Sequence, residues 1–135
     1  MIFDTGPLFA AAFSKDPDHE VCARLLQSTK VVAVPGPVIA EVGFLLGKSG
    51  GPRAEAAFLR SISAPKYRIL NPTGGELRRA AQLVEQYGDL PLGTTDAVVM
   101  AMAESRNDPA IATLDRRHFT VVRPAGFPTF QIVPD

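Results

Sequence analysis

Four acidic residues, far apart in the sequence, stand at positions where a carboxylate could do chemistry: Asp4, Glu41, Asp96 and Asp115. Asp4 follows the apolar pair Ile2-Phe3, and Asp115 follows the apolar segment 111–113. Both are predicted strand ends, and ligands of parallel α/β sheets bind outside the carboxyl ends of the strands. An aspartate there also commonly forms a turn or caps a helix, so either residue taken alone has a purely structural explanation.

The other two acids, Glu41 and Asp96, fall within predicted helices. Asp96 follows the predicted N-cap Thr94, where a carboxylate suits the helix dipole, but the residues three, four and seven positions on are apolar. Glu41 belongs to a helix that is apolar nearly all round over residues 37–46, so we expect it to be buried. A buried carboxylate is costly unless it binds a cation or pairs with an arginine, and this segment has no basic residue before Lys48.

Brought together, these carboxylates indicate a site for a hard divalent cation. Without a cation they would repel one another, and some would have to stay protonated. A donor set of carboxylates, without cysteine or histidine, is typical of Mg²⁺ or Mn²⁺ and not of Zn²⁺. We therefore expect Mg²⁺ at the four acids, with Mn²⁺ able to replace it.

The elements that must position these acids alternate between short apolar strands and helices. The expected strands are residues 2–4, 31–34, 67–70 and 110–113, with further short ones at 121–122 and near 130–133. The expected helices are a short one ending at 13, then 16–28, 37–46, 52–62, 73–87 and 94–106, with a glycine-rich break over 47–52. This alternation predicts an α/β fold with a mostly parallel sheet and helices on both faces.

The composition fits one ordinary domain over residues 1–135, of which 46% are hydrophobic. The 14 basic residues balance 14 acidic ones. This argues against a polybasic nucleic-acid binder but not against a nuclease, since a bound metal supplies positive charge locally. We find no membrane-spanning run, no signal peptide and a single cysteine, Cys22, and so expect a cytoplasmic protein that is not attached to a membrane.

Four segments of the chain match one known family in order and approximate spacing. They are Ile2–Leu8, Val38–Val42, Asp89–Leu92 leading to Thr95–Ala97, and Ile111–Phe119. No segment is specific alone, but together they place each acid where the residues already indicated one. The chain resembles the PIN-domain nucleases and, within them, the VapC-type toxins of bacterial toxin–antitoxin pairs. The resemblance covers essentially the whole chain and implies a three-layer α/β/α sandwich.

This resemblance implies a metal-dependent endoribonuclease, the toxin of a type II toxin–antitoxin module, that cleaves RNA phosphodiester bonds by metal-activated water. It also implies an RNA substrate, a cognate antitoxin protein and, commonly, a homodimer. Thr5 and Thr113 match positions where a hydroxyl lies beside the acids, and Arg116 matches a basic or polar position able to touch phosphate. His118 stands where the family more often has an acid or another polar residue, and no role follows for it.

Other interpretations of the same residues stay open. An RNA-processing nuclease without an antitoxin, or a non-catalytic metal-binding α/β module, would share the fold. Asp4-Thr5-Gly6 also matches the Asp-Thr-Gly of aspartic proteases, but those would require an all-β homodimer. A receiver-type phosphorylation switch requires a second acid directly after the first, where this chain has Thr5, and a lysine after a late strand, where Thr113 is followed by none.

Overall fold

One parallel sheet forms the middle of the molecule. The computed structural model describes all residues, 1–135. Its strands are β1 (Ile2–Phe3), β2 (Val32–Pro35), β3 (Tyr67–Leu70), β4 (Ala110–Ala112) and β5 (Gln131–Val133), in the spatial order β3-β2-β1-β4-β5. Every neighbouring pair is parallel, which confirms the predicted α/β class.

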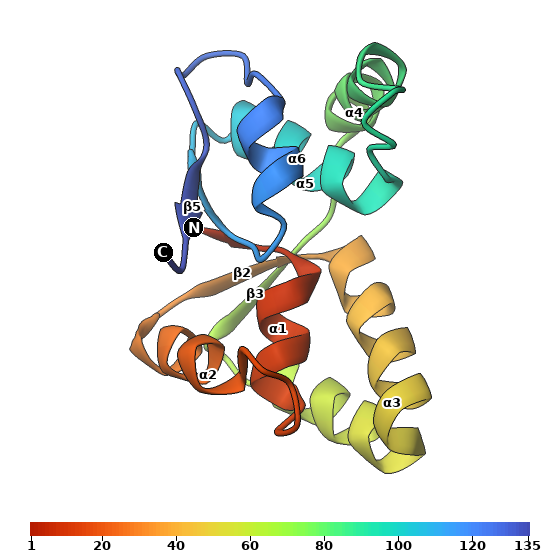
Figure 1. The fold of residues 1–135 in the computed structure, drawn as a ribbon, viewed down its shortest axis with the longest axis vertical. Coiled ribbons are helices and arrows are strands. Elements are labelled where there is room, and N and C mark those ends of the chain that lie inside the picture. The colour runs from red at the N-terminus through yellow and green to blue at the C-terminus, as the bar shows by residue number, and fades with distance from the viewer.

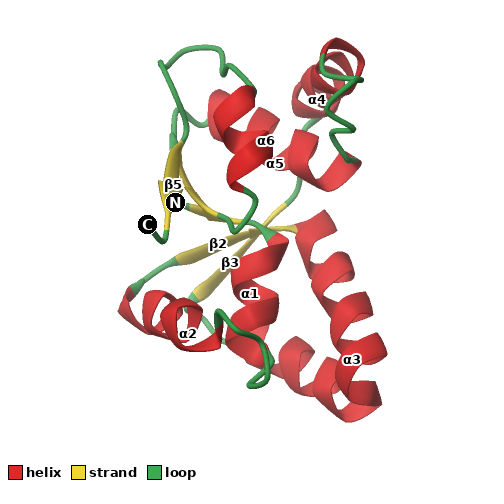
Figure 2. Cartoon of the chain, viewed as in Figure 1, coloured by secondary structure: helices red, strands yellow, loops and turns green.

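Helices cover both faces of this sheet. They are α1 (Thr5–Ala12), α2 (His19–Ser28), α3 (Gly36–Ile62), α4 (Gly74–Gln86), α5 (Thr94–Ser105) and α6 (Arg116–Val121). Figure 1 shows α1, α2 and α3 grouped on one side and α4, α5 and α6 grouped on the other. In Figure 2 the strands, in yellow, lie between the two groups, as the α/β/α sandwich requires. No helix has both the length and the apolar character needed to cross a membrane.

The core is built around the central strands and α5. Ile2 and Phe3 of β1 are each 1% exposed, as expected for a strand that is covered on both faces. Every residue of α5 from Ala97 to Ala103 is buried, so this helix is held on several sides by the core. Asp96 directly precedes this buried run and is therefore carried on a rigid element.

Several predicted boundaries are wrong. Residues 121–122 do not form a strand: Val121 ends α6 and Val122 follows as its C-cap. Helix α6, which was not predicted, begins at Arg116 because the carboxylate of Asp115 accepts a hydrogen bond from the backbone N–H of His118 and forms an N-cap. Helix α2 begins at His19 and not at residue 16, and helix α5 has Gly93, not Thr94, as its N-cap.

The break predicted over residues 47–52 is a kink at a single residue, Gly51. Its dihedrals are φ 78° and ψ −178°, while helical conformation continues on both sides from Gly36 to Ile62. This region of conformational space is open essentially to glycine alone. Pro52 follows directly, in the first-turn position that a proline tolerates, so Gly51-Pro52 ends one helical segment of α3 and begins the next, as the two separate predicted helices require.

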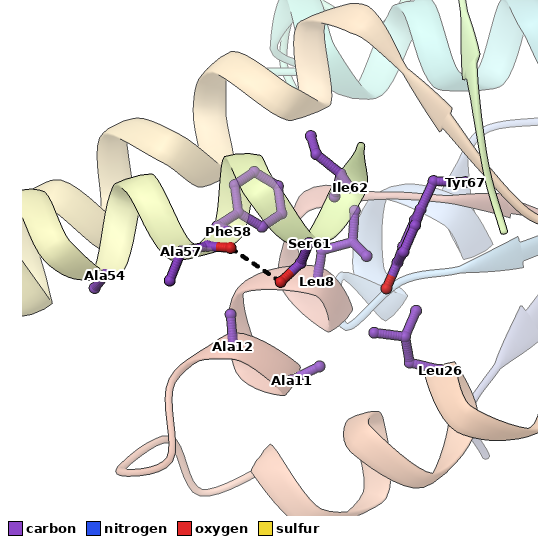
Figure 3. Close-up of a pocket in the computed structure, with 10 residues that line it drawn as sticks. All are labelled: Leu8, Ala11, Ala12, Leu26, Ala54, Ala57, Phe58, Ser61, Ile62 and Tyr67. Carbon is purple, nitrogen blue, oxygen red and sulfur yellow. Dashed lines mark hydrogen bonds between the residues drawn. The ribbon is translucent and has the colours of Figure 1, made fainter. Parts of the chain in front are cut away.

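An apolar cavity of about 220 Å³ lies between α1, α2 and the last turns of α3. Figure 3 shows Leu8 between Phe58 and Tyr67, with Leu26 near Tyr67, among the side chains that line it. The hydroxyl of Ser61 also lines this cavity but donates to the carbonyl of Ala57, at 2.9 Å. None of the four acids lines it, so the cavity is separate from the acidic residues.

Replacing Gly51 with alanine is expected to lower the free energy of unfolding by about 1–3 kcal/mol, because a side chain at this φ is strained. Urea denaturation measures the change. Gly75→Ala is the matched control: it lies in the first turn of α4, and a Cβ there meets no atom closer than 3.9 Å. Alanine at Gly75 is expected to stabilise by up to about 1 kcal/mol. Equal unfolding midpoints for Gly51→Ala and the wild type would contradict the kink's dependence on glycine.

Candidate active site

The four acids singled out from the sequence lie together in the structure. Asp4, Glu41, Asp96 and Asp115 line one hollow at the surface, together with Thr5, Gly6 and Leu114. Each acid comes from a different part of the chain: the end of β1, the first half of α3, the first turn of α5 and the connection between β4 and α6. Figure 1 shows the start of α1, the start of α3 and the loop before α6 close to one another near the middle of the molecule.

The parallel pairing of β1 with β4 brings Asp4 and Thr113 to the same edge of the sheet. The backbone N–H of Asp4 donates to the carbonyl of Ala112 at 2.8 Å, extending the pairing by one residue. The hydroxyl of Thr113 donates to Oδ2 of Asp4 at 2.8 Å and accepts the backbone N–H of Asp115 at 3.0 Å. This one hydroxyl therefore links the carboxylate of Asp4 to the backbone of Asp115, while the supporting role of Thr113 stays a prediction.

Asp4 leaves a polar atom without a partner in the interior. The residue is only 4% exposed, and its Oδ1 makes no hydrogen bond; the hydroxyl oxygen of Thr5, 7% exposed, also makes none. Buried polar atoms are nearly always satisfied, so an orphaned carboxylate oxygen requires an explanation. A hard cation is the partner that a carboxylate oxygen among further carboxylates would accept. The donor set thus fits a divalent cation.

The pKa values of Asp4 and Asp96 also indicate that the hollow lacks positive charge. Burial, followed by the negative charge of Asp96, raises the pKa of Asp4 to about 6, although the backbone N–H of Thr5 and the hydroxyl of Thr113 oppose the shift. Burial also raises the pKa of Asp96; the charge of Asp115 adds to this effect. Two of the acids therefore hold protons more tightly than ordinary aspartates do.

Glu41 is exposed, so the prediction that it is buried is wrong. Helix α3 is apolar but not buried all round where it passes the site: Val38 and Val42 are fully buried, whereas Phe44 is 67% exposed. Glu41 lies on the exposed side and reaches the hollow from its solvent edge. Its negative charge still contributes to the raised pKa values of Asp4 and Asp96, so it belongs to the same electrostatic cluster.

His118, to which the sequence analysis assigned no role, lies against two of the acids. Its Nδ1 is 2.6 Å from Oδ2 of Asp96 and 2.8 Å from Oδ2 of Asp115. Partial burial lowers the pKa of His118, but the hydrogen bond to Asp96 and the two negative charges outweigh it, and the net shift is upward. The available signal was the spacing of three between Asp115 and His118, which places both on one side of a helix. The strand predicted at 121–122 concealed that helix.

Arg116 points away from the hollow in this structure. Its side chain is exposed, and its guanidinium donates to the carbonyl of Pro134 near the C-terminus. It does not line the hollow with the acids. The phosphate contact expected for Arg116 therefore stays a prediction, and it would require this residue to exchange its present partner.

We expect Asp4→Asn to stabilise the metal-free protein at neutral and alkaline pH. The folded-state pKa of about 6 lies above the ordinary 3.8, so the stability that the protonated form supplies is complete below about pH 4. It is lost as the pH rises through 6, and the loss is on the order of 3 kcal/mol. Asparagine has no proton to lose, so the difference in unfolding free energy between variant and wild type should grow over this range.

Urea denaturation in EDTA at several pH values measures that difference. Glu85→Gln, which removes an exposed acid on α4, is the control and is expected to show no such growth. A constant difference between Asp4→Asn and the wild type from about pH 4 to about pH 8 would show that burial does not penalise the Asp4 charge.

The comparisons with known proteins agree on one family. A model of the PIN domain matches residues 1–123. Ribonuclease VapC26 of Mycobacterium tuberculosis is 34% identical over 135 residues, which cover 99% of this chain and 100% of that protein. The fold is similar to that of M. tuberculosis VapC20, with a TM-score of 0.76, 23% identity and coverage of 82% of this chain and 87% of the other. A toxin–antitoxin complex from Klebsiella pneumoniae also matches, with a TM-score of 0.67, 21% identity and coverage of 98% and 95%. The family match over most of the chain and the relative aligned along almost all of it show that this chain belongs to the PIN domain family, among the VapC-type ribonucleases.

Proposed function

We propose that the protein is a metal-dependent endoribonuclease and the toxin of a type II toxin–antitoxin pair. The observation that carries this proposal is the orphaned, buried Oδ1 of Asp4, which lines a hollow with three further carboxylates. Membership of the VapC-type ribonucleases supports RNA as the substrate and a toxin as the biological role. Residues 1–135 act as one domain in this proposal, in the cytoplasm where RNA is encountered.

The ligands we propose for the cation, Mg²⁺ or Mn²⁺, are Asp4, Glu41, Asp96 and Asp115. When bound, such a cation makes a water molecule more acidic and offsets the negative charge of the phosphate. Asp4 is held for this task by Thr113, which occupies Oδ2 and leaves Oδ1 free. Glu41 reaches the hollow from the solvent edge, so it is placed to accept a proton from the attacking water or to orient it.

The substrate we propose is a single-stranded loop or bulge of a folded RNA. Asp115 keeps a side-chain exposure of 36%, and Glu41 is exposed, so the acids are accessible from the surface. A splayed loop can bring one phosphate to such an edge, whereas a duplex holds its backbone in a regular groove. Arg116 and Arg117 are exposed directly after Asp115 and would contact neighbouring phosphates, replacing the Arg116 contact with Pro134.

A cognate antitoxin is the protein partner that this function requires. Proteins with this fold have been solved in the Klebsiella pneumoniae toxin–antitoxin complex and as part of VapBC2 from Rickettsia felis bound to a promoter DNA fragment. We propose an antitoxin for this chain on that basis. A homodimer remains a prediction from the family resemblance alone.

Purified protein is expected to cut folded RNA in Mg²⁺ or Mn²⁺ and to stop when EDTA is added. Asp4→Asn and Asp96→Asn should each lower the cleavage rate at least about a hundredfold, since each removes a charge that holds the cation. Glu85→Gln removes an exposed acid outside the hollow and should retain the wild-type rate. Denaturing gels give the rates, and circular dichroism checks the fold. Full activity in both aspartate variants would defeat the assignment.

The toxin role predicts a small DNA-binding protein encoded immediately upstream of this gene. Expression of the chain alone should arrest bacterial growth, and co-expression of the upstream protein should restore it. Asp96→Asn should be harmless with or without that protein. Growth arrest that the upstream protein leaves unchanged would instead favour an RNA-processing nuclease without an antitoxin.

A further inference from the structure

The imidazole of His118 faces hydrogen-bond acceptors on every side. Nδ1 lies between the Oδ2 atoms of Asp96 and Asp115, at 2.6 and 2.8 Å, and Nε2 lies 3.1 Å from the carbonyl oxygen of Leu90. A neutral imidazole carries one N–H and one lone pair. Because a carbonyl can only accept, Leu90 assigns the N–H to Nε2. The lone pair of the neutral ring is then on Nδ1, directed between two carboxylate oxygens, so this nitrogen must hold either a proton or a metal ion.

Asp96 and Asp115 each direct one carboxylate oxygen, Oδ2, toward Nδ1 of His118. Asp115 uses its Oδ1 to cap α6, accepting the backbone N–H of His118 at 3.0 Å, which leaves Oδ2 for the ring. One ligand atom from each of Asp96, Asp115 and His118 lies within 4.8 Å of the others. One ion can therefore contact all three. Independently, the unpartnered and buried Oδ1 of Asp4 belongs to the hollow that Asp96 and Asp115 line.

We propose that His118 is itself a metal ligand through Nδ1, acting with Asp96 and Asp115. This inference rests on the metal site of the proposed function and adds a nitrogen donor to its carboxylates. A nitrogen–metal bond needs the Nδ1 lone pair, so any proton on Nδ1 would leave to solvent when the ion binds. The carbonyl of Leu90 holds Nε2–H and keeps the ring in the orientation that presents Nδ1, which is the usual arrangement of metal-binding histidines.

A nitrogen ligand changes which metal the site prefers. Mg²⁺ binds oxygen almost exclusively, whereas imidazole suits transition-metal ions. With His118 in the site, Mn²⁺ should bind more tightly than Mg²⁺, and the advantage should depend on the ring. His118 would thus determine metal selectivity, while the four acids supply the charge that any divalent ion requires.

Pulsed electron paramagnetic resonance of the Mn²⁺-loaded full-length protein tests the nitrogen bond directly. The chain has two histidines, and His19 lies at the start of α2 with its Nδ1 against the carbonyl of Ala10. We expect the modulation of a directly bound ¹⁴N, replaced by the ¹⁵N pattern when the protein is labelled with ¹⁵N-histidine. His19→Gln should retain this signal, and His118→Asn should lose it.

Calorimetric titration with Mn²⁺ and with Mg²⁺ supplies the second measurement. His118→Asn keeps an N–H donor near the two aspartates but removes the imidazole nitrogen. Its Kd for Mn²⁺ should rise about tenfold to a hundredfold, while its Kd for Mg²⁺ should change by about threefold or less. Thermal unfolding in EDTA checks that the variant folds. If it does not, the isotope experiment on wild-type protein still decides the proposal.

The absence of nitrogen modulation in wild-type protein loaded with Mn²⁺ would overturn the proposal. So would an unchanged preference for Mn²⁺ over Mg²⁺ in a folded His118→Asn variant. Neither result affects the proposed nuclease function, which stands or falls on RNA cleavage and its loss in Asp4→Asn and Asp96→Asn. A nitrogen signal without RNA cleavage would support the ligand and reject the nuclease.

Discussion

The main physical constraint on this structure is the mutual repulsion of the carboxylates that it gathers in one partly buried hollow. Asp4 is almost completely buried, and both burial and the neighbouring charge of Asp96 raise its pKa to about 6. A protein keeps such an arrangement only if something positive compensates for it. In the metal-free fold the basic side chain in contact with these acids is His118, between Asp96 and Asp115. Oδ1 of Asp4 still has no partner, and a divalent ion would supply the positive charge that is missing there.

The fold satisfies this constraint by placing the acids on rigid elements. A parallel sheet brings the ends of neighbouring strands to one edge, so the pairing of β1 with β4 alone juxtaposes Asp4 and Thr113. Helix α5 is buried along Ala97–Ala103, so Asp96 in its first turn has little freedom to move away from the other charges. The cost of gathering the charges is thus met by core packing elsewhere in the domain.

Sequence reasoning succeeded where a local signal and the global fold agree. The helix predicted to begin at residue 73 does so: Thr73 is its N-cap and forms a full capping box with Glu76. The strand at residues 67–70 has the predicted bounds, and β5 lies inside the segment expected near 130–133. The meeting of Asp4 and Asp115 followed from the rule that parallel strands end at one edge, which needs no knowledge of side-chain packing.

It failed where the outcome depends on which side of a helix meets solvent. Glu41 has apolar neighbours in sequence, but α3 leaves one side open, and exposed Phe44 lies on that side with it. Composition alone does not distinguish a helix packed all round from one with an apolar exposed stripe. His118 was missed because the N-cap that starts α6 is made by a residue already assigned to metal binding. One side chain serving two purposes is hard to recognise from a linear pattern.

That double use of Asp115 limits what the position can accept in related chains. One carboxylate oxygen secures the beginning of a six-residue helix, and the other meets the imidazole. Glutamate would carry the same charge on a longer arm, yet it is not among the residues favoured as N-caps. Exchange of Asp115 for glutamate would thus preserve the negative charge but loosen the turn that delivers His118. Shape, and not charge alone, specifies aspartate at this position.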